Sequence, residues 1–301
     1  MSINTLDRPV KAVVFRHLSL RRRIKNNIAT AFFVTSFGLA LVPLIWVLGV
    51  VVVRGWRAVI HMDWWTHSLR GVLPNEFGGG VYHALYGSLV QAGMAAVLAV
   101  PLGVMTAVYL VEYRTGRLAR VTTFMLDVLA GVPSIVAALF IFSLWIATLQ
   151  FTQSAIAVSF ALVLLMLPVV VRATEEMLRL VPDELREASY ALGVPKWKTV
   201  VRIVFPIAMP GIVAGILLAL ARVLGETAPV LVLVGYSRSI NYDIFDGNMA
   251  TLPLLIYSEI ANPSSAGFQR VWGAALTLIL IVALINLTAA AIRFVTSWRR
   301  R

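Results

Sequence analysis

The sequence predicts an all-α integral membrane protein with six transmembrane helices and both termini in the cytoplasm. Of its 301 residues, 59% are hydrophobic and only 13% are charged, whereas soluble domains carry roughly a quarter charged residues. Six runs are long and apolar enough to cross a bilayer core, which needs about 20 such residues in a helix. Nearly all Lys and Arg residues lie between these runs. Lipid is therefore the expected solvent for most of the chain.

The expected spans divide the chain into a basic cytoplasmic tail, residues 1–28, a membrane domain, 29–293, and a second basic tail, 294–301. The first span is too long for the apolar region of a cleavable signal, which has about 7–15 residues. Prolines inside the runs predict kinks instead of breaks, because neighbouring helices can satisfy the freed backbone groups. The six spans are 29–53, 86–111, 121–146, 154–171, 207–234 and 271–292.

The distribution of basic residues sets the expected orientation. Twenty of the 26 Lys and Arg residues lie in the N-terminal tail, in the residues after the sixth span (from 293 on) and in the 112–120 and 172–206 loops. Only five lie in the 54–85 and 235–270 loops. Because cytoplasmic loops carry the excess of Lys and Arg, both termini and the 172–206 loop are expected inside the cell. The polar 235–270 segment is then an external loop.

Several classes of function are disfavoured by composition. The net charge of +12 is spread between apolar blocks, which is not the basic face of a nucleic-acid-binding protein. No cysteine is present, so thiolate chemistry and disulfides are excluded. The four histidines, His17, His61, His67 and His83, lack metal-binding spacing, and no phosphate-binding Gly-rich loop occurs. We expect no enzyme activity and no cofactor in this chain, so any ATP must bind to another polypeptide.

The 172–206 loop has the pattern of two short helices joined by a tight turn. Pro182 and the acidic residues after it suit a helix N-terminus, and Gly193 suits a C-terminal stop. Between them lies Glu187-Ala188-Ser189, with Gly193 six residues after the glutamate. By themselves these residues also suit an ordinary amphipathic connector between two spans.

Arg222 and Glu226 stand inside the fifth expected span. Charged residues at this depth cost a few kcal/mol each and usually mark a pathway or a pair. In a continuous helix their i, i+4 spacing places both on one face, about 6 Å apart along the axis. That face either lines a translocation pore or forms a structural ion pair that holds the bundle together.

The chemistry of this segment suits an oxyanion. Arginine presents a permanently charged planar fork that matches phosphate or carboxylate oxygens. Phosphate near neutral pH retains a proton that Glu226 can accept, whereas sulfate has none. Gly225 permits close backbone approach, and Thr227 adds a hydroxyl group. The pair is thus compatible with phosphate.

Other polar residues have simpler interpretations. Gly131, Pro133 and Ser134 are expected to kink the third span and permit close packing. Asp127 is interpreted as an interfacial cap, and Glu112 with Arg114 as a loop charge pair.

Two motifs resemble known families. The 187–206 stretch is similar to the EAA loop of ABC-importer permeases, with Ser189 and Phe205 as mild departures. The segment from Arg222 to Pro229, Arg-Val-Leu-Gly-Glu-Thr-Ala-Pro, resembles the A-type permease subunit of bacterial phosphate ABC transporters. Further stretches resemble that family in the same order, and the resemblance covers roughly residues 75–293. They are Gly78–Ala84, Gly87–Leu89, Tyr109–Tyr113, Gly131–Val136, Thr251–Pro253, Ile256–Tyr257 and Asn286–Leu287.

The resemblance implies a type I ABC importer permease fold and a permease subunit for ATP-driven import of inorganic phosphate across the bacterial plasma (inner) membrane. It assigns the substrate pathway to Arg222, Glu226 and Thr227. It assigns the ATPase-coupling loop to Glu187, Ala188, Ser189 and Gly193. The implied partners are a second, C-type permease, an ATPase dimer that binds ATP and Mg, and an extracytoplasmic phosphate-binding protein.

Three alternatives remain open from the sequence. The first is an ABC permease for another oxyanion, such as molybdate or sulfate, or for an organic solute. The second is a secondary transporter driven by an ion gradient, which would need no docking loop. The third is a membrane-embedded enzyme, for which the chain offers no HExxH, no Gly-x-Ser-x-Gly and no intramembrane Asp pair.

Overall fold

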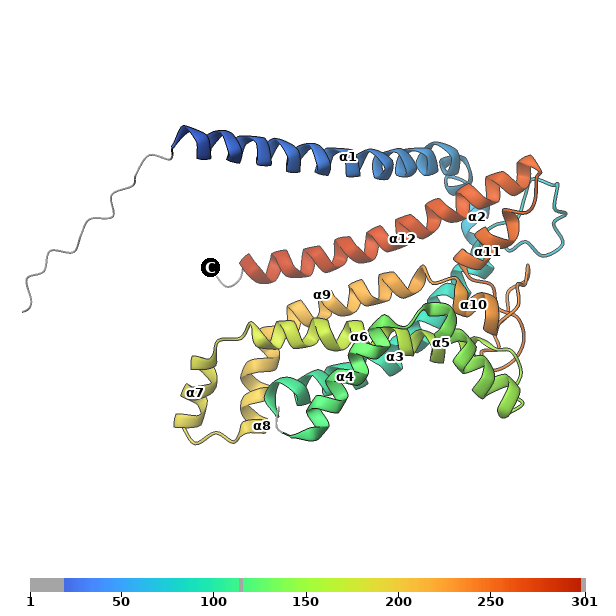
Figure 1. Ribbon diagram of the computed structural model, residues 1–301. Coiled ribbons are helices and arrows are strands. Elements are labelled where there is room, and N and C mark those ends of the chain that lie inside the picture. The colour runs from blue at the N-terminus through green and yellow to red at the C-terminus, as the bar shows by residue number, and fades with distance from the viewer. Residues whose placement is uncertain (1–18, 114–115, 299–301) are drawn as a thin grey trace, which may run out of the picture. The chain divides into compact units, whose positions relative to one another are not determined.

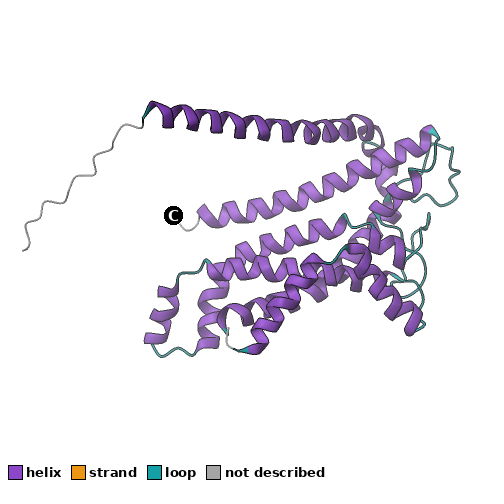
Figure 2. Cartoon of the chain, viewed as in Figure 1, coloured by secondary structure: helices purple, strands orange, loops and turns teal. Residues whose placement is uncertain are grey.

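The structure, a computed structural model, describes residues 19–113 and 116–298. These residues form helices joined by loops, with no strand among them (Figure 2). The prediction of an all-α membrane protein is confirmed. The chain divides into two compact units, residues 1–50 and 51–301. The helix α1 (Leu20–Val59) begins in the first unit and ends in the second.

The second unit contains the remaining elements. In Figure 1, α7 and α8 lie at one end of this unit, and α10 and α11 lie at the other. Two segments, η1 and η2, are π-helical. The bounds are α2 (Met62–Thr66), α3 (Tyr82–Glu112), α4 (Arg117–Gly131), α5 (Ser134–Ile141), η1 (Phe142–Thr148), α6 (Ala155–Arg179), α7 (Asp183–Ala191), α8 (Lys196–Thr199), η2 (Val200–Val204), α9 (Phe205–Leu224), α10 (Ala228–Leu233), α11 (Leu252–Glu259) and α12 (Ser265–Trp298).

Five helical segments are long and apolar enough to span a bilayer: α1, α3, α6, Lys196–Leu224 and α12. A sixth is formed by α4 with Ser134–Thr148, if this bent pair counts as one span. The six predicted spans therefore all have counterparts. The fourth span is longer than predicted, because α6 continues past residue 171 to Arg179.

Two predicted spans are broken, however, and not merely kinked. The chain bends by 106° between Arg117–Gly131 and Ser134–Thr148. Pro133 causes this break, since its ring removes a backbone donor and disfavours helical geometry at Val132. The predicted continuous helix over 207–234 is also wrong, because α9 ends at Leu224 and α10 begins at Ala228.

The core of the second unit lies between α3, α6 and α9, with α12 packed on α9. Small residues line the α3–α6 interface, which allows the two backbones to approach closely, as is typical in membranes. A Cβ added to Gly103 would lie 2.8 Å from the Val170 side chain. The alanines of this interface are Ala92, Ala95, Ala99, Ala155 and Ala161.

The segment between Val234 and Ser265, predicted to be an external loop, is exposed only in part. Its first part carries exposed polar residues such as Asp243 and Asp246. Met249, Ala250 and Thr251 are buried, and α11 follows and packs against α12. The apolar second half of the segment thus belongs to the core.

Candidate functional site

The predicted anion-binding residues lie around the end of α9. The backbone amide of Gly225 donates to the Arg222 carbonyl, 3.1 Å away, and that of Glu226 donates to Val223, also at 3.1 Å. These short-range bonds replace the continuing helical ladder. Pro229 in the first turn of α10 has no amide hydrogen with which to continue the helix. Arg222 therefore stands in the last turn of α9 and Glu226 within the break that follows, and not on one face of a helix.

Arg222 is exposed and lines a cavity of about 340 Å³. The other side chains of this cavity come from α6 and from the end of α4, including Pro168 near the middle of α6. Most of them are apolar, and the charged ones are Arg172 and Glu176. The full lining is Leu129, Ala130, Val132, Leu165, Pro168, Val169, Arg172, Ala173, Glu176 and Arg222. We call this the Arg222 cavity.

Arg172 differs from Arg222 because its guanidinium group is paired with acidic side chains. It forms ion pairs with Asp127 of α4 and, at 2.8 Å, with Glu175 of its own helix. Glu175 is buried and also lies 3.8 Å from Arg179. Asp127 is therefore an ion-pair partner that joins α4 to α6, and not the interfacial cap that the sequence suggested.

Arg222 has no such partner. Its side chain forms no ion pair or hydrogen bond with the residues that the structure describes. The same holds for the half-buried Glu226 side chain, across residues 19–113 and 116–298. The structural ion pair that was the alternative interpretation is not formed between Arg222 and Glu226, nor with any other residue that the structure describes. A permanently charged guanidinium facing an apolar cavity leaves its donors available for an anion.

The break between α4 and α5 meets the same cavity. Leu129, Ala130 and Val132, at the end of α4, are lining residues. Non-helical backbone at membrane depth is tolerated where it is buried in protein or lines a cavity. Two interrupted spans therefore converge where Arg222 lies, an arrangement typical of transport sites in the membrane.

Sequence reasoning missed the contributions of α6. It treated residues from 172 onward as a cytoplasmic loop, whereas Arg172, Glu175 and Glu176 lie on the last turns of a continuous helix. The signal was available in part, since the acidic and basic residues 172, 175, 176 and 179 follow helical spacing. The pairing of Arg172 with Asp127 needed tertiary contacts.

The predicted helix–turn–helix of the coupling loop is present. Asp183 and Glu184 lie in the first turn of α7, and Gly193 has a φ of +74°, which favours glycine. From α8 the chain continues through η2 into α9 as one span, Lys196–Leu224. The second arm of the hairpin is thus an extension of the helix that carries Arg222.

The four predicted docking residues are not equivalent. Glu187, Ala188 and Gly193 are exposed, and nothing lies within 4 Å of a Cβ added to Gly193. Ser189 is buried, and its hydroxyl lies 2.7 Å from that of Thr199 in α8. Ser189 therefore fastens the two arms to each other and is not a surface contact.

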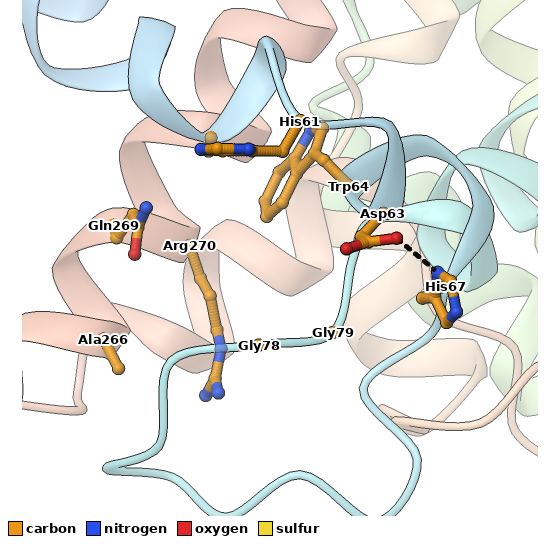
Figure 3. A pocket seen from close by; sticks show the side chains of 10 residues that line it. His61, Asp63, Trp64, His67, Gly78, Gly79, Ala266, Gln269 and Arg270 are labelled. Atoms are coloured by element: carbon orange, nitrogen blue, oxygen red, sulfur yellow. Dashed lines mark ion pairs between the residues drawn. The ribbon is translucent and has the colours of Figure 1, made fainter.

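A second polar pocket, of about 360 Å³, lies where α2 meets the Gly78–Gly79 loop and α12 (Figure 3). The His67 and Asp63 side chains approach to 3.6 Å across it, and both are exposed. Arg270 is already used: it bonds Glu259 and the carbonyls of Leu73, Pro74 and Glu76. No group of three or more metal-ligating side chains occurs in the described part of the chain. This pocket therefore lacks the free cation that distinguishes the Arg222 cavity.

Comparisons with known proteins agree with this description. A family model described as "Binding-protein-dependent transport system inner membrane component" matches residues 99–299. The chain is 78% identical to the phosphate transport system permease protein PstA 1 of Mycobacterium tuberculosis, covering 100% of this chain and 98% of that protein. It is 77% identical to PstA of Mycobacterium leprae, covering 99% and 98%.

Among solved structures, a bacterial alginate ABC transporter aligns with a TM-score of 0.62 at 12% identity, over 90% of this chain and 96% of that one. At this identity the likeness concerns the fold alone, which is that of an ABC importer permease. The resemblance drawn from the Arg222–Pro229 segment is confirmed at the level of the family. The chain belongs to the family of binding-protein-dependent transport system inner membrane components and, within it, to the phosphate transport system permease proteins.

Proposed function

We propose that this chain is the permease subunit of an ATP-driven importer of inorganic phosphate, with Arg222 as the residue that receives the anion. The observation that supports the proposal most is an arginine with no acidic partner among residues 19–113 and 116–298, lining a cavity where two spans are interrupted. The relatives that are 77% and 78% identical carry phosphate transport in their names.

Phosphate is the oxyanion that this site suits best. The Arg222 fork can donate two parallel hydrogen bonds to adjacent oxygens of a tetrahedral anion. Glu226 and Thr227, which lie within the helix break, supply an acceptor and a hydroxyl group for the proton that phosphate retains. Sulfate and molybdate carry no such proton near neutral pH. Glu176, across the Arg222 cavity, is a second carboxylate of the same kind.

The ATPase is proposed to dock on the exposed face of the α7–α8 hairpin, at Glu187, Ala188 and Gly193. ATP and Mg would bind to that partner and not to this chain. A second, C-type permease would complete the pathway, and an extracytoplasmic binding protein would deliver phosphate. With the positive-inside rule, the hairpin and both termini lie in the cytoplasm.

The test is uptake of radioactive phosphate by the full complex in proteoliposomes, with ATP enclosed and the binding protein outside. Arg222→Gln should lower uptake by about tenfold or more, because hydrogen bonds to charged groups contribute about 1.5–3 kcal/mol. Arg293→Gln is the matched control, since Arg293 is an exposed arginine near the end of α12 and far along the chain from the cavity.

Competing anions separate the alternatives. Excess unlabelled phosphate should abolish the signal, whereas excess sulfate or molybdate should leave it. Equal competition by all three anions would favour the broader oxyanion permease. Uptake that follows an imposed ion gradient without ATP would favour the secondary transporter. Normal uptake by Arg222→Gln would refute the role given to Arg222.

A further inference from the structure

Arg186, one residue before the Glu187-Ala188-Ser189 motif, points inward from α7, and its guanidinium group is fully used. Nε and one Nη2 hydrogen donate to Glu112 Oε1, at 3.1 and 3.0 Å. The other Nη2 hydrogen donates to the Leu178 carbonyl at 2.9 Å. Nη1 donates to the Val181 carbonyl at 2.7 Å and to Asp183 at 2.9 Å. All five N–H donors of an arginine are therefore bonded.

Glu112 is the last residue of α3, and its side chain is only 4% exposed. The second arm of the hairpin reaches the same point, because Lys196 Nζ contacts the Glu112 carbonyl and lies 4.9 Å from the Tyr113 ring centroid. Both arms thus hold the end of α3. The chain does not connect α3 to the hairpin directly, since α4, α5 and α6 intervene. Glu112 thus pairs with Arg186. The predicted charge pair of Glu112 with Arg114 stays a prediction, because Arg114 lies outside the described residues.

The opposite end of α3 holds the buried segment 249–252. Gln91 Nε2 donates to the Met249 carbonyl at 3.3 Å, and the Leu252 amide donates to Ser88 Oγ at 2.8 Å. A Cβ on Gly87 would overlap the Ala250 carbonyl oxygen, so the two backbones are in direct contact. Residues 87–91 and Glu112 are 21 to 25 residues apart on the continuous helix α3, so these two attachments are separated by roughly 32 to 38 Å along its axis.

The 249–252 segment leads back to the helix break beside the anion site. Asn248 Oδ1 accepts a hydrogen bond from the Gly235 amide at 3.0 Å, just after α10. Met249 packs in the same core cluster as Val230 and Leu233 of α10. The first residue of α10 directly follows Glu226 and Thr227. A displacement of α3 along its axis would therefore be passed to α10 through the contacts of residues 248 and 249 with residues 230–235.

We propose that Arg186 and Glu112 are positioning residues that make α3 move with the ATPase-docking hairpin. The hairpin's displacement then reaches segment 249–252 and, through α10, the break next to Arg222. This inference rests on the proposed function, because it requires an ATPase that moves the hairpin. The inference is that the hairpin's movement is transmitted through α3, in addition to the covalent connections of the hairpin to α6 and α9.

The absence of cysteine in this chain allows a direct test with a single reporter. Asp246→Cys places a thiol on the exposed part of the loop that precedes segment 249–252. In the full complex with cysteine-free partners, its rate of reaction with a membrane-impermeant maleimide is compared without nucleotide and with ATP plus vanadate. The rate should change on nucleotide trapping in the parent chain, and the change should be lost on adding Glu112→Gln or Arg186→Gln.

ATP hydrolysis should continue in these variants, so the ratio of ATP hydrolysed to phosphate transported should rise by about fivefold or more, the low end of typical coupling between sites. Arg179→Gln is the matched control, because the ion pair of Arg179 with Glu175 lies within α6. Its reporter response and its ratio should match the parent chain. A purely structural role would lower the yield of complex without changing the ratio.

A second variant keeps the test independent of folding. Glu112→Cys with Arg186→Cys, without the reporter, is bridged by a short bis-methanethiosulfonate cross-linker. Coupling should be restored by the bridge and lost again on its reduction, within one preparation. Parent-like coupling in both Gln variants, or no effect of the bridge, would overturn the inference. If the parent complex itself shows no ATP-dependent uptake, the proposed function fails, and the inference fails with it.

Discussion

Arg222 and Arg186 carry the same charge in opposite surroundings. Arg186 is largely buried, and every one of its donors has a partner in this chain. Arg222 faces a cavity, and its side chain has no partner among the residues that the structure describes. A satisfied arginine stabilises the arrangement of helices, whereas an unsatisfied one is available to a ligand. The contrast distinguishes an arginine that holds helices together from the arginine proposed to bind the anion.

The largest expected effect on stability is at the satisfied arginine. Glu112→Ala should destabilise the chain by about 3–5 kcal/mol, because it removes the buried carboxylate of a largely buried guanidinium and leaves the exposed Asp183 as its acidic partner. Arg222→Ala should change stability by no more than about 0.5 kcal/mol, as for an exposed residue without partners. Unfolding of both variants in the same detergent measures the difference. Equal losses would remove the distinction between the two arginines.

Arg270 provides an intermediate case. It is buried against Glu259 and three backbone carbonyls, so it belongs with Arg186 in this comparison. Arg270→Gln should cost about 1.5–3 kcal/mol, less than Glu112→Ala because Glu259 keeps Arg238 as a partner at 3.2 Å. Phosphate uptake per folded molecule should be unchanged. A selective loss of uptake would indicate that the pocket of Figure 3 takes part in transport.

A smaller loss of stability than at Glu112 or Arg270 is expected at Gly193, in the turn between α7 and α8. Gly193→Ala meets no neighbouring atom, but its φ of +74° is unfavourable for alanine. The substitution should lower the free energy of unfolding by about 1–2 kcal/mol. Relief of this strain should change the angle between α7 and α8. We expect a modest rise in ATP hydrolysed per phosphate transported. An unchanged ratio would show that docking tolerates this turn, and a loss of anion selectivity would contradict the separation of the two regions.

The fold class could be predicted because the hydropathy of each segment and the positions of Lys and Arg are read directly from the order of residues, without tertiary contacts. It also predicted the α7–α8 hairpin, since Pro182, Gly193 and Pro195 act locally. The breaks at Val132–Pro133 and at Gly225–Thr227 were missed. An apolar run containing proline is compatible with either a kink or a break, and only tertiary packing decides between them.

The candidate site could be predicted only in part, because some of its residues are brought together by tertiary contacts. Arg222 stood out as a charge within an apolar run, and the structure places it at a cavity. Its neighbours Arg172 and Glu176 come from another helix, so their proximity could not be read from spacing. Ser189 was assigned to the docking surface by its motif, but helical phase turns it inward towards Thr199. The apolar residues after Asn248 were a usable sign that segment 249–252 is buried.

The role of Arg222 is tested most directly by a structure of the full complex trapped with phosphate bound. The anion should lie within hydrogen-bond distance of the Arg222 guanidinium, with Arg186 still bonded to Glu112. Phosphate bound elsewhere, with Arg222 paired to a carboxylate of the second permease, would contradict it.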